Sequence, residues 1–174
     1  MIGHSTRPID EFLAMLKGHD ITKLVDVRTV PRSRANPQFN KDILPGSLGP
    51  AGIGYIHVPE LGGLRKPKPD SPNSAWQNLS FRGYADHMQT DEFARGLDVL
   101  FGWIQSDRIA MMCAEAVPWR CHRSLIADAL TVRGVTVLEI TNPAKSHPHK
   151  MISFAKVEGT SITYPNEALS EIEG

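Results

Sequence analysis

The chain of 174 residues contains only two cysteines, too few for the disulfide framework that holds many small secreted proteins together. It has no apolar run near the roughly 20 residues that a membrane span requires. Its first residues show neither the basic stretch nor the apolar region of a signal peptide. These absences predict a cytoplasmic protein without membrane contact, whose cysteines are free thiols unless they bind a metal or react.

The chain also lacks an excess of charge of either sign, with 19 Lys and Arg, 19 Asp and Glu, and a formal net charge of zero. Residues 158–174 contain four glutamates and no Lys or Arg, so the preceding part carries a small positive surplus. That surplus is far below the strongly basic balance of typical nucleic-acid-binding domains. It is nevertheless compatible with a local cationic pocket.

The sequence alternates short β-prone runs with helical segments, which is the pattern of a parallel sheet covered by helices. Strands are predicted near residue 2 and over residues 23–27, 54–58, 109–113 and 135–140. Helices are predicted over residues 8–18, 41–44, 91–105 and 124–133, with another that follows residues 81–84. Residues 151–157 and 160–164 flank a Glu-Gly turn and predict a β-hairpin.

We therefore expect an α/β fold with three layers, a mostly parallel central sheet of about five strands, and a C-terminal β-hairpin. Residues 1–174 are expected to form one α/β domain, with residues 1–140 as the core. Residues 141–174 are expected to form a tail whose hairpin packs on that core, because so small a hairpin is marginal alone. Residues 62–80 form an unusually long polar loop, which indicates a functional role or disorder.

Polar residues follow the predicted strands at their carboxyl ends. Ligands of open α/β sheets bind outside these ends, and in a parallel sheet the ends share one edge. The polar residues are therefore predicted to converge on one pocket. The predicted site comprises His4, Ser5, Asp26, Arg28, Arg32, Arg34, Asn40, Glu60, Arg82, Tyr84, Cys113, Glu115, Trp119, Arg120, Cys121, His122 and Arg123.

The most informative segment of the chain runs from the end of one strand to the start of the next helix. Cys113 ends an apolar strand, and Cys121 and His122 stand at the helix start between two arginines. Helix starts bind anions, and a cationic setting lowers a thiol pKa from about 8.5 to roughly 3.5–7.5. Cys113 and Cys121 are the candidate nucleophiles, and His4 and His122 are the candidate proton-transfer groups. The alternatives are cysteines that pack as small apolar residues and histidines that hydrogen-bond the backbone.

Arginine suits the bidentate recognition of phosphate, so Arg28, Arg82, Arg120 and Arg123 are the candidate anion ligands. The alternatives are a solvated surface position for these arginines, or acidic neighbours that anchor their guanidinium groups. Trp119, Tyr84 and Phe39 are candidates for stacking on a base or sugar, with core packing as the alternative. Cys113, Cys121 and His122, with His4 or His57, offer metal ligands, but the sequence has no Cys-x-x-Cys pair. No metal site is predicted, and the sequence identifies no cofactor.

Several motifs together resemble the bacterial and archaeal family named domain of unknown function 488. They are Gly3-His4-Ser5-Thr6, Val25-Asp26-Val27-Arg28, Pro31-Arg32-Ser33-Arg34 with Pro37-Gln38-Phe39-Asn40, Pro59-Glu60-Leu61-Gly62-Gly63, Phe81-Arg82-Gly83-Tyr84-Ala85, and Cys113-Ala114-Glu115 with Cys121-His122-Arg123. The resemblance extends from Ile2 to the Tyr164-Pro165 tail, and implies a fold and a pocket but no established reaction. Members of the family usually have several residues before the first motif, whereas here only Met1 and Ile2 precede it. We therefore expect the first strand to be short.

A second resemblance concerns mechanism. Residues 24–28 resemble the strand of rhodanese-type sulfurtransferases, whose catalytic cysteine ends a strand in a loop closed by an arginine at a helix start. The segment from Cys113 to Arg120 resembles that loop, although six residues intervene here instead of the five of related cysteine phosphatases. This resemblance implies that Cys113 is the nucleophile.

The sequence thus favours an enzyme that acts on a phosphorylated or nucleotide-like anion, with a cysteine-dependent hydrolase or transferase as the specific hypothesis. The alternative is a non-catalytic module that binds nucleic acid or nucleotides through arginines and aromatic residues. The expected partner is accordingly an anionic small molecule or a nucleic acid. No oligomeric state is predicted.

Overall fold

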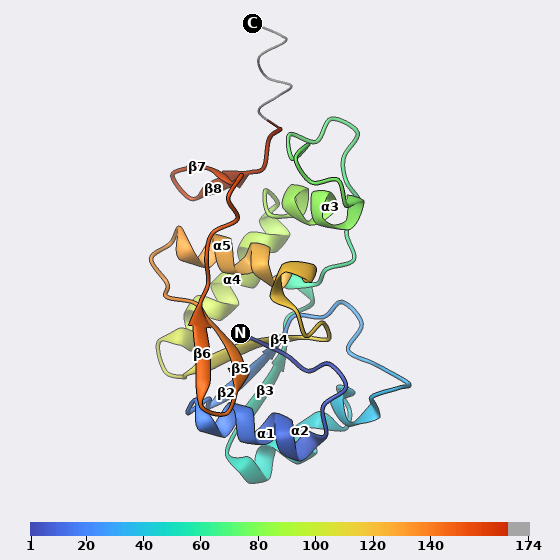
Figure 1. The fold of residues 1–174 in the computed structure, drawn as a ribbon, viewed down its shortest axis with the longest axis vertical. Helices are drawn as coiled ribbons and strands as arrows, with labels where there is room; N and C mark the ends of the chain where they lie inside the picture. Colours follow the sequence, from blue (N-terminus) through green and yellow to red (C-terminus); the bar gives the residue numbers. More distant parts are fainter. Residues whose placement is uncertain (167–174) are drawn as a thin grey trace, which may run out of the picture.

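A computed structural model describes residues 1–166 of the chain (Figure 1). Its main sheet has four parallel strands in the order β1-β4-β2-β3. These strands are β1 (Ile2–Gly3), β4 (Ile109–Cys113), β2 (Lys23–Asp26) and β3 (Gly54–His57). The parallel register places Gly3 beside Cys113 and Asp26 beside His57. The carboxyl ends of all four strands therefore meet at one edge of the sheet.

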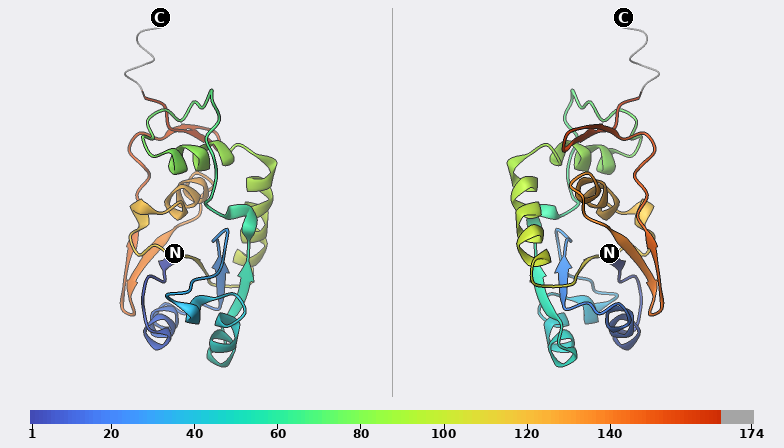
Figure 2. Two further views of the ribbon diagram at one scale, coloured as in Figure 1. Left: turned by 90° about the vertical axis from the view of Figure 1, so that its right-hand side faces the viewer. Right: turned by 90° about the vertical axis from the view of Figure 1, so that its left-hand side faces the viewer.

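Helices pack against both faces of this sheet (Figure 2). They are α1 (Ile9–Gly18) and α2 (Leu44–Leu48) on one face, and α4 (Asp91–Ile104) and α5 (Arg123–Thr131) on the other, with α3 (Leu79–His87) beyond α5. Successive residues of β2 point to opposite faces, so Leu24 joins the core under α1 while Val25 joins the core under α4 and α5. This arrangement confirms the predicted α/β class with a parallel sheet. No helix of the described residues is long and apolar enough to cross a membrane.

The prediction of a fifth strand in the main sheet is wrong. Instead, β5 (Leu138–Asn142) pairs antiparallel with β6 (Lys145–Pro148) as a separate two-stranded sheet. The chain reverses directly after β5 because Asn142 Oδ1 accepts a hydrogen bond of 2.9 Å from the Ala144 N–H. The β5–β6 hairpin lies beside β1, where the Ile140 N–H donates to the Met1 carbonyl at 2.9 Å.

The C-terminal hairpin is confirmed, although its strands are shorter than predicted. It consists of β7 (Lys156–Glu158) and β8 (Ser161–Thr163), and Gly159 in the turn has a φ of 64°. Ile162 and Tyr164 are buried in the core beside α4 and α5.

Two helix boundaries differ from the predictions for a local reason in each case. The helix expected over residues 41–44 begins only at Leu44 and continues through Pro45, because proline fits the first turn of a helix. The helix expected after Tyr84 begins earlier, since the Asn78 side chain accepts hydrogen bonds from the first N–H groups of α3. Thr90 caps α4 as predicted.

We expect an Asp128→Ala substitution to lower the free energy of unfolding by about 3 kcal/mol or more. Asp128 is fully buried on α5 and accepts hydrogen bonds from His149 Nε2 at 2.6 Å and Tyr164 Oη at 2.9 Å. The substitution leaves both tail donors without a partner. Urea denaturation measures the effect, with the exposed Asp98→Ala as the matched control. A loss equal to that of the control would contradict the role of Asp128 as the anchor of the tail.

Candidate functional site

The centre of the site is a thiol held against a buried guanidinium. Cys113, at the end of β4, is 2 % exposed, and its Sγ accepts a hydrogen bond of 2.7 Å from Arg123 Nη1. Arg123, in the first turn of α5, is fully buried and forms a 2.8 Å ion pair with Glu139 of β5. It also donates to the carbonyl groups of Glu115 and Ala116. The guanidinium is therefore fixed between the loop after β4, the thiol and a carboxylate.

The second cysteine lies next to the first and has the opposite electrostatic character. A hydrogen bond from the Cys121 thiol, supported by the charge of Arg123, lowers the pKa of Cys113 to about 7 although burial opposes the shift. The same hydrogen bond and burial raise the pKa of Cys121 far above its usual range. Cys113 is accordingly the thiol of the pair that loses its proton first as the pH rises, and Cys121 is the donor that stays protonated.

Both candidate histidines hydrogen-bond to backbone carbonyl groups, which was the alternative to a proton-transfer role. His122 Nε2 donates to the Val27 carbonyl at 2.9 Å, which leaves Nδ1 as an acceptor 3.7 Å from Cys121 Sγ. His4 Nδ1 donates to the Ser5 carbonyl at 2.7 Å. Burial lowers the pKa of each histidine to about 4. Both rings are therefore neutral at pH 7.

Gly63 allows the His122 ring to lie where it does. A Cβ atom at position 63 would lie 2.5 Å from His122 Nδ1, which is closer than van der Waals contact allows. The loop after β3 can therefore approach the ring only with glycine here. This contact explains the second glycine of the Gly62-Gly63 pair, while a Cβ atom at position 62 would lie 2.4 Å from Thr29 Oγ1.

The guanidinium of Arg28 is anchored by the acidic side chain of Asp26, which was one alternative to a role in anion binding. Its Nε and Nη2 donate to the Asp26 carboxylate at 2.9 and 2.6 Å, and Nη2 also donates to the Phe39 carbonyl at 2.7 Å. Asp26 also accepts a 2.6 Å hydrogen bond from Tyr55. The charge of Arg28 is thus largely compensated, and 7 % of the residue remains exposed.

Cys113, Cys121, His122 and Arg28 border a cavity of about 340 Å³, which we call the thiol cavity. It is lined by Arg28, Thr29, Val30, Gly63, Leu64, Ser80, Phe81, Cys113, Ala114, Glu115, Arg120, Cys121 and His122. Thr29, Val30, Leu64, Ser80 and Phe81 were not among the predicted site residues, although Ser80 falls in the long loop that the sequence singles out. The walls are predominantly apolar, so a ligand that binds here needs apolar groups as well as charge.

A second cavity of about 480 Å³ adjoins the thiol cavity and shares Arg28, Val30, Ala114 and Glu115 with it. It adds His4, Ser5 and Arg32 from the predicted set. The carboxyl ends of the strands therefore bring together nine of the predicted residues along two adjoining hollows. They are His4, Ser5, Arg28, Arg32, Cys113, Glu115, Arg120, Cys121 and His122.

Other predicted residues lie outside these two cavities. They are Asp26, Arg34, Asn40, Glu60, Arg82, Tyr84, Trp119 and Arg123. Tyr84 is buried and donates to the Leu61 carbonyl at 2.7 Å, while Arg82 Nε donates to the Trp76 carbonyl at 3.0 Å. Asn40 Oδ1 accepts a hydrogen bond of 2.7 Å from the Ser33 N–H. Arg34 is exposed, and Trp119 borders a different cavity.

The residues that the structure describes contain no group of three or more His, Cys, Asp or Glu side chains that could hold a metal ion.

A comparison with protein-family models finds one described as domain of unknown function DUF488, which matches residues 8–130. The chain belongs to this family. The DUF488 match begins at the start of α1 and ends within α5, so it includes both cysteines and Arg123. His4 and the two C-terminal hairpins lie outside the matched residues. Searches of curated proteins and of solved structures found no match, and no comparison supports the resemblance to rhodanese-type sulfurtransferases.

Proposed function

We propose that this chain is a cysteine-dependent transferase or hydrolase acting on a phosphorylated or nucleotide-like anion, with Cys113 as the nucleophile. The observation that carries the proposal is the 2.7 Å hydrogen bond from the buried Arg123 guanidinium to Cys113 Sγ at a cavity wall. A thiolate is the reactive form of cysteine, and a fixed guanidinium stabilises it. A cysteine that only filled space in the core would not need a buried cation beside it.

The other groups have distinct roles in this proposal. Arg123 and Arg28 are engaged with Glu139 and Asp26, so they position groups of the site and do not bind the substrate anion. Arg120 is exposed at the cavity wall and is the arginine that would contact the anion. Arg82, the fourth arginine that the sequence suggested as an anion ligand, does not line the cavity. Arg120 is therefore the anion ligand that we propose.

The reaction begins when Cys113 Sγ attacks the phosphorus atom of the substrate. A sulfur–phosphorus bond forms as the bond to the leaving oxygen breaks, and the leaving oxygen takes a proton from solvent. Water then releases phosphate in a hydrolase, or a second substrate accepts the phosphoryl group in a transferase. Either release regenerates the Cys113 thiolate.

A non-catalytic nucleotide-binding module is the second candidate, and the exposure of Trp119 favours it. This side chain is 73 % exposed next to Arg120, an arrangement suited to stacking on a base beside a phosphate contact. Binding that falls steeply with salt, in a protein whose thiols do not react, would support this alternative.

We expect native Cys113 to react with iodoacetamide at a rate that rises through a midpoint near pH 7, because only the thiolate is alkylated and the pKa of Cys113 is about 7. The same protein unfolded in urea should show a midpoint near the ordinary thiol pKa of about 8.5. Mass spectrometry of the alkylated protein at a series of pH values measures both curves. A native midpoint at or above the unfolded one, or a native protein that is not alkylated, would remove the basis of the thiol mechanism.

A further inference from the structure

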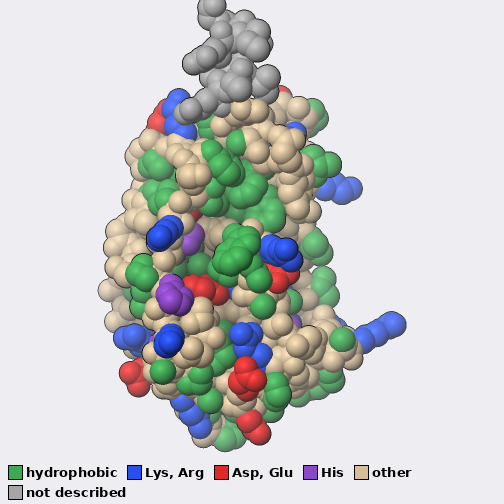
Figure 3. Space-filling view, in the orientation of Figure 1, with side chains coloured by type: hydrophobic (Ala, Val, Ile, Leu, Met, Phe, Trp, Pro, Cys, Tyr) green, Lys and Arg blue, Asp and Glu red, His purple; other side chains and the backbone are tan. Residues whose placement is uncertain are grey.

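A larger cavity of about 550 Å³ shares the loop of residues 114–120 with the thiol cavity but has no lining residue in common with it. We call it the tryptophan cavity, because Trp119 and Trp76 both line it. Its other walls come from β1, from the loop before α5 and from the β5–β6 hairpin with the residues that follow. In Figure 3 the face that contains this region shows hydrophobic side chains bordered by histidine and by Lys or Arg.

Two buried polar atoms of the lining residues have no hydrogen-bond partner. One is Glu139 Oε2, whose residue is 8 % exposed and whose Oε1 is held by Arg123. The other is the Nε1 donor of Trp76. A buried polar group without a hydrogen-bond partner lowers the stability of the fold. A ligand that supplies the missing donor or acceptor removes that cost. Glu139 and Trp76 both line the cavity, although the two unpaired atoms themselves have almost no exposed surface. To bind them, an occupant would have to shift the side chains that cover them.

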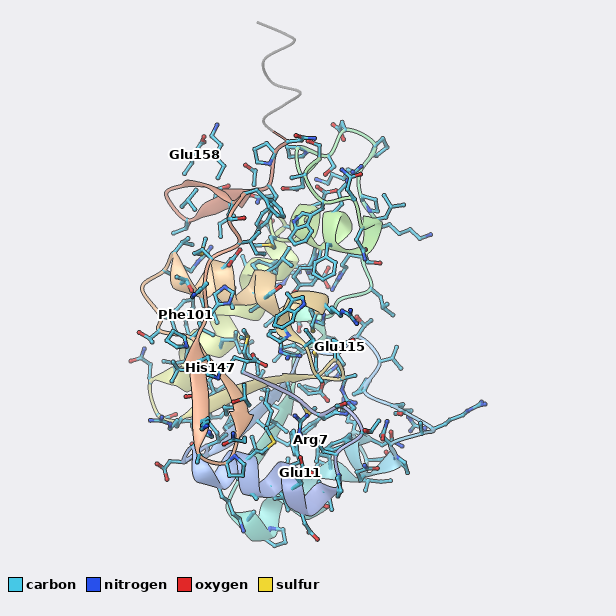
Figure 4. All side chains as sticks on the ribbon, viewed as in Figure 1. Arg7, Glu11, Phe101, Glu115, His147 and Glu158 are labelled. Atoms are coloured by element: carbon cyan, nitrogen blue, oxygen red, sulfur yellow. The ribbon has the colours of Figure 1, made fainter. Side chains whose placement is uncertain are left out.

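The remaining groups indicate the kind of occupant. Trp119 presents a ring that is 73 % exposed, a suitable platform for a planar heteroaromatic group. Lys150 contributes a cation to the cavity, which Arg7 and His147 also line. Arg7 is paired with Glu11 at 3.3 Å, so Lys150 is the cation that we assign to a phosphate. Figure 4 shows Arg7 and His147, which come from the β1–α1 loop and from β6, on the face that also carries Glu115.

His149 also lines this cavity, and its Nε2 is held by the buried Asp128 at 2.6 Å. The lining therefore combines an aromatic face, polar side chains, and the cationic Lys150.

We propose that the tryptophan cavity binds a nucleoside monophosphate. The base stacks on Trp119 and presents its edge to Glu139 and Trp76, while the phosphate lies near Lys150. This site shares no lining residue with the thiol cavity, and binding there does not require a reaction at Cys113.

Calorimetric titration of the full chain carrying Cys113→Ser tests this proposal without interference from thiol chemistry. The ligands are adenosine, guanosine, cytidine and uridine 5′-monophosphates, with ribose 5-phosphate as the control that lacks a base. We expect at least one nucleotide to bind saturably and ribose 5-phosphate to bind at least tenfold more weakly. Failure of all four nucleotides to saturate, or equal binding of ribose 5-phosphate, would overturn the proposal.

Three variants locate the binding. Trp119→Ala should weaken nucleotide binding at least tenfold, whereas Leu79→Ala, an exposed apolar residue outside both cavities, should leave it unchanged. Lys150→Ala should weaken binding of the nucleotide but not of the corresponding nucleoside. Trp119 and Lys150 are at the surface, so both variants should fold. Equal affinity of Trp119→Ala and the parent protein would overturn the assignment. Alkylation of Cys113 tests the proposed reaction separately, so the two proposals can fail independently.

Discussion

Replacing Arg123 with methionine is expected to lower the free energy of unfolding by about 3–5 kcal/mol. Arg123 is fully buried, and its guanidinium pairs with Glu139 while it also holds two backbone carbonyls and the Cys113 thiol. Methionine has a comparable volume but no donors, so the substitution leaves a carboxylate buried without its cation. Urea denaturation at pH 7 measures the loss.

The double substitution Arg123→Met with Glu139→Met separates the charge effect from the packing effect. It should recover part of the stability, because no uncompensated charge remains in the core. The matched surface control is Arg95→Met, whose side chain is exposed on α4 and whose effect should stay within about 0.5 kcal/mol. If Arg123→Met were as stable as this control, the guanidinium would not be the link between the loop after β4 and strand β5.

Replacing Cys113 with serine is expected to abolish the alkylation of the native protein at pH 7, because a serine hydroxyl stays protonated and unreactive at this pH. Replacing Cys121 with alanine should leave the protein reactive. It should also move the midpoint of alkylation to higher pH, because the hydrogen bond from Cys121 is the main cause of the lowered pKa of Cys113. Peptide mapping by mass spectrometry identifies the labelled residue in each variant.

The opposite pattern would assign the reaction differently. If the Cys121→Ala protein were inert and the Cys113→Ser protein were still alkylated at pH 7, Cys121 would be the nucleophile. The hydrogen-bond donor and acceptor of the pair would then exchange roles. Thermal denaturation of both variants should accompany the labelling, so that a reactive unfolded fraction is not taken for a native thiol.

The position of the two adjoining cavities could be predicted because it follows from sheet geometry. The runs around Leu24, Ile56 and Met111 read as buried parallel strands, and the carboxyl ends of such strands must share an edge. His4, Arg28 and Cys113 do line adjoining cavities there. The pairing of Asp26 with Arg28 was also visible in the sequence as an alternative, since only one residue separates them.

The burial of Arg123 and its ion pair with Glu139 could not be predicted from the sequence. A basic residue at a helix start usually faces solvent, and nothing local indicates that this one is fully buried. Its partner Glu139 comes from β5, which the strand pattern placed in the main sheet. The β6 partner of that strand was missed because residues 145–148, Lys-Ser-His-Pro, lack the apolar alternation that marks a strand.

One guanidinium stands between the two cavities described above. Arg123 contacts the Cys113 sulfur through Nη1 and the Glu139 carboxylate through Nη2, and each of those partners lines a different cavity. If the proposed nucleotide hydrogen-bonds to Glu139, it should weaken the ion pair of that carboxylate with Arg123 and increase the positive potential at the Cys113 sulfur. Ligand affinity at one cavity and proton affinity at the other would then be thermodynamically linked, and the linkage would be reciprocal. Arg123 would thereby connect two surfaces that share no lining residue.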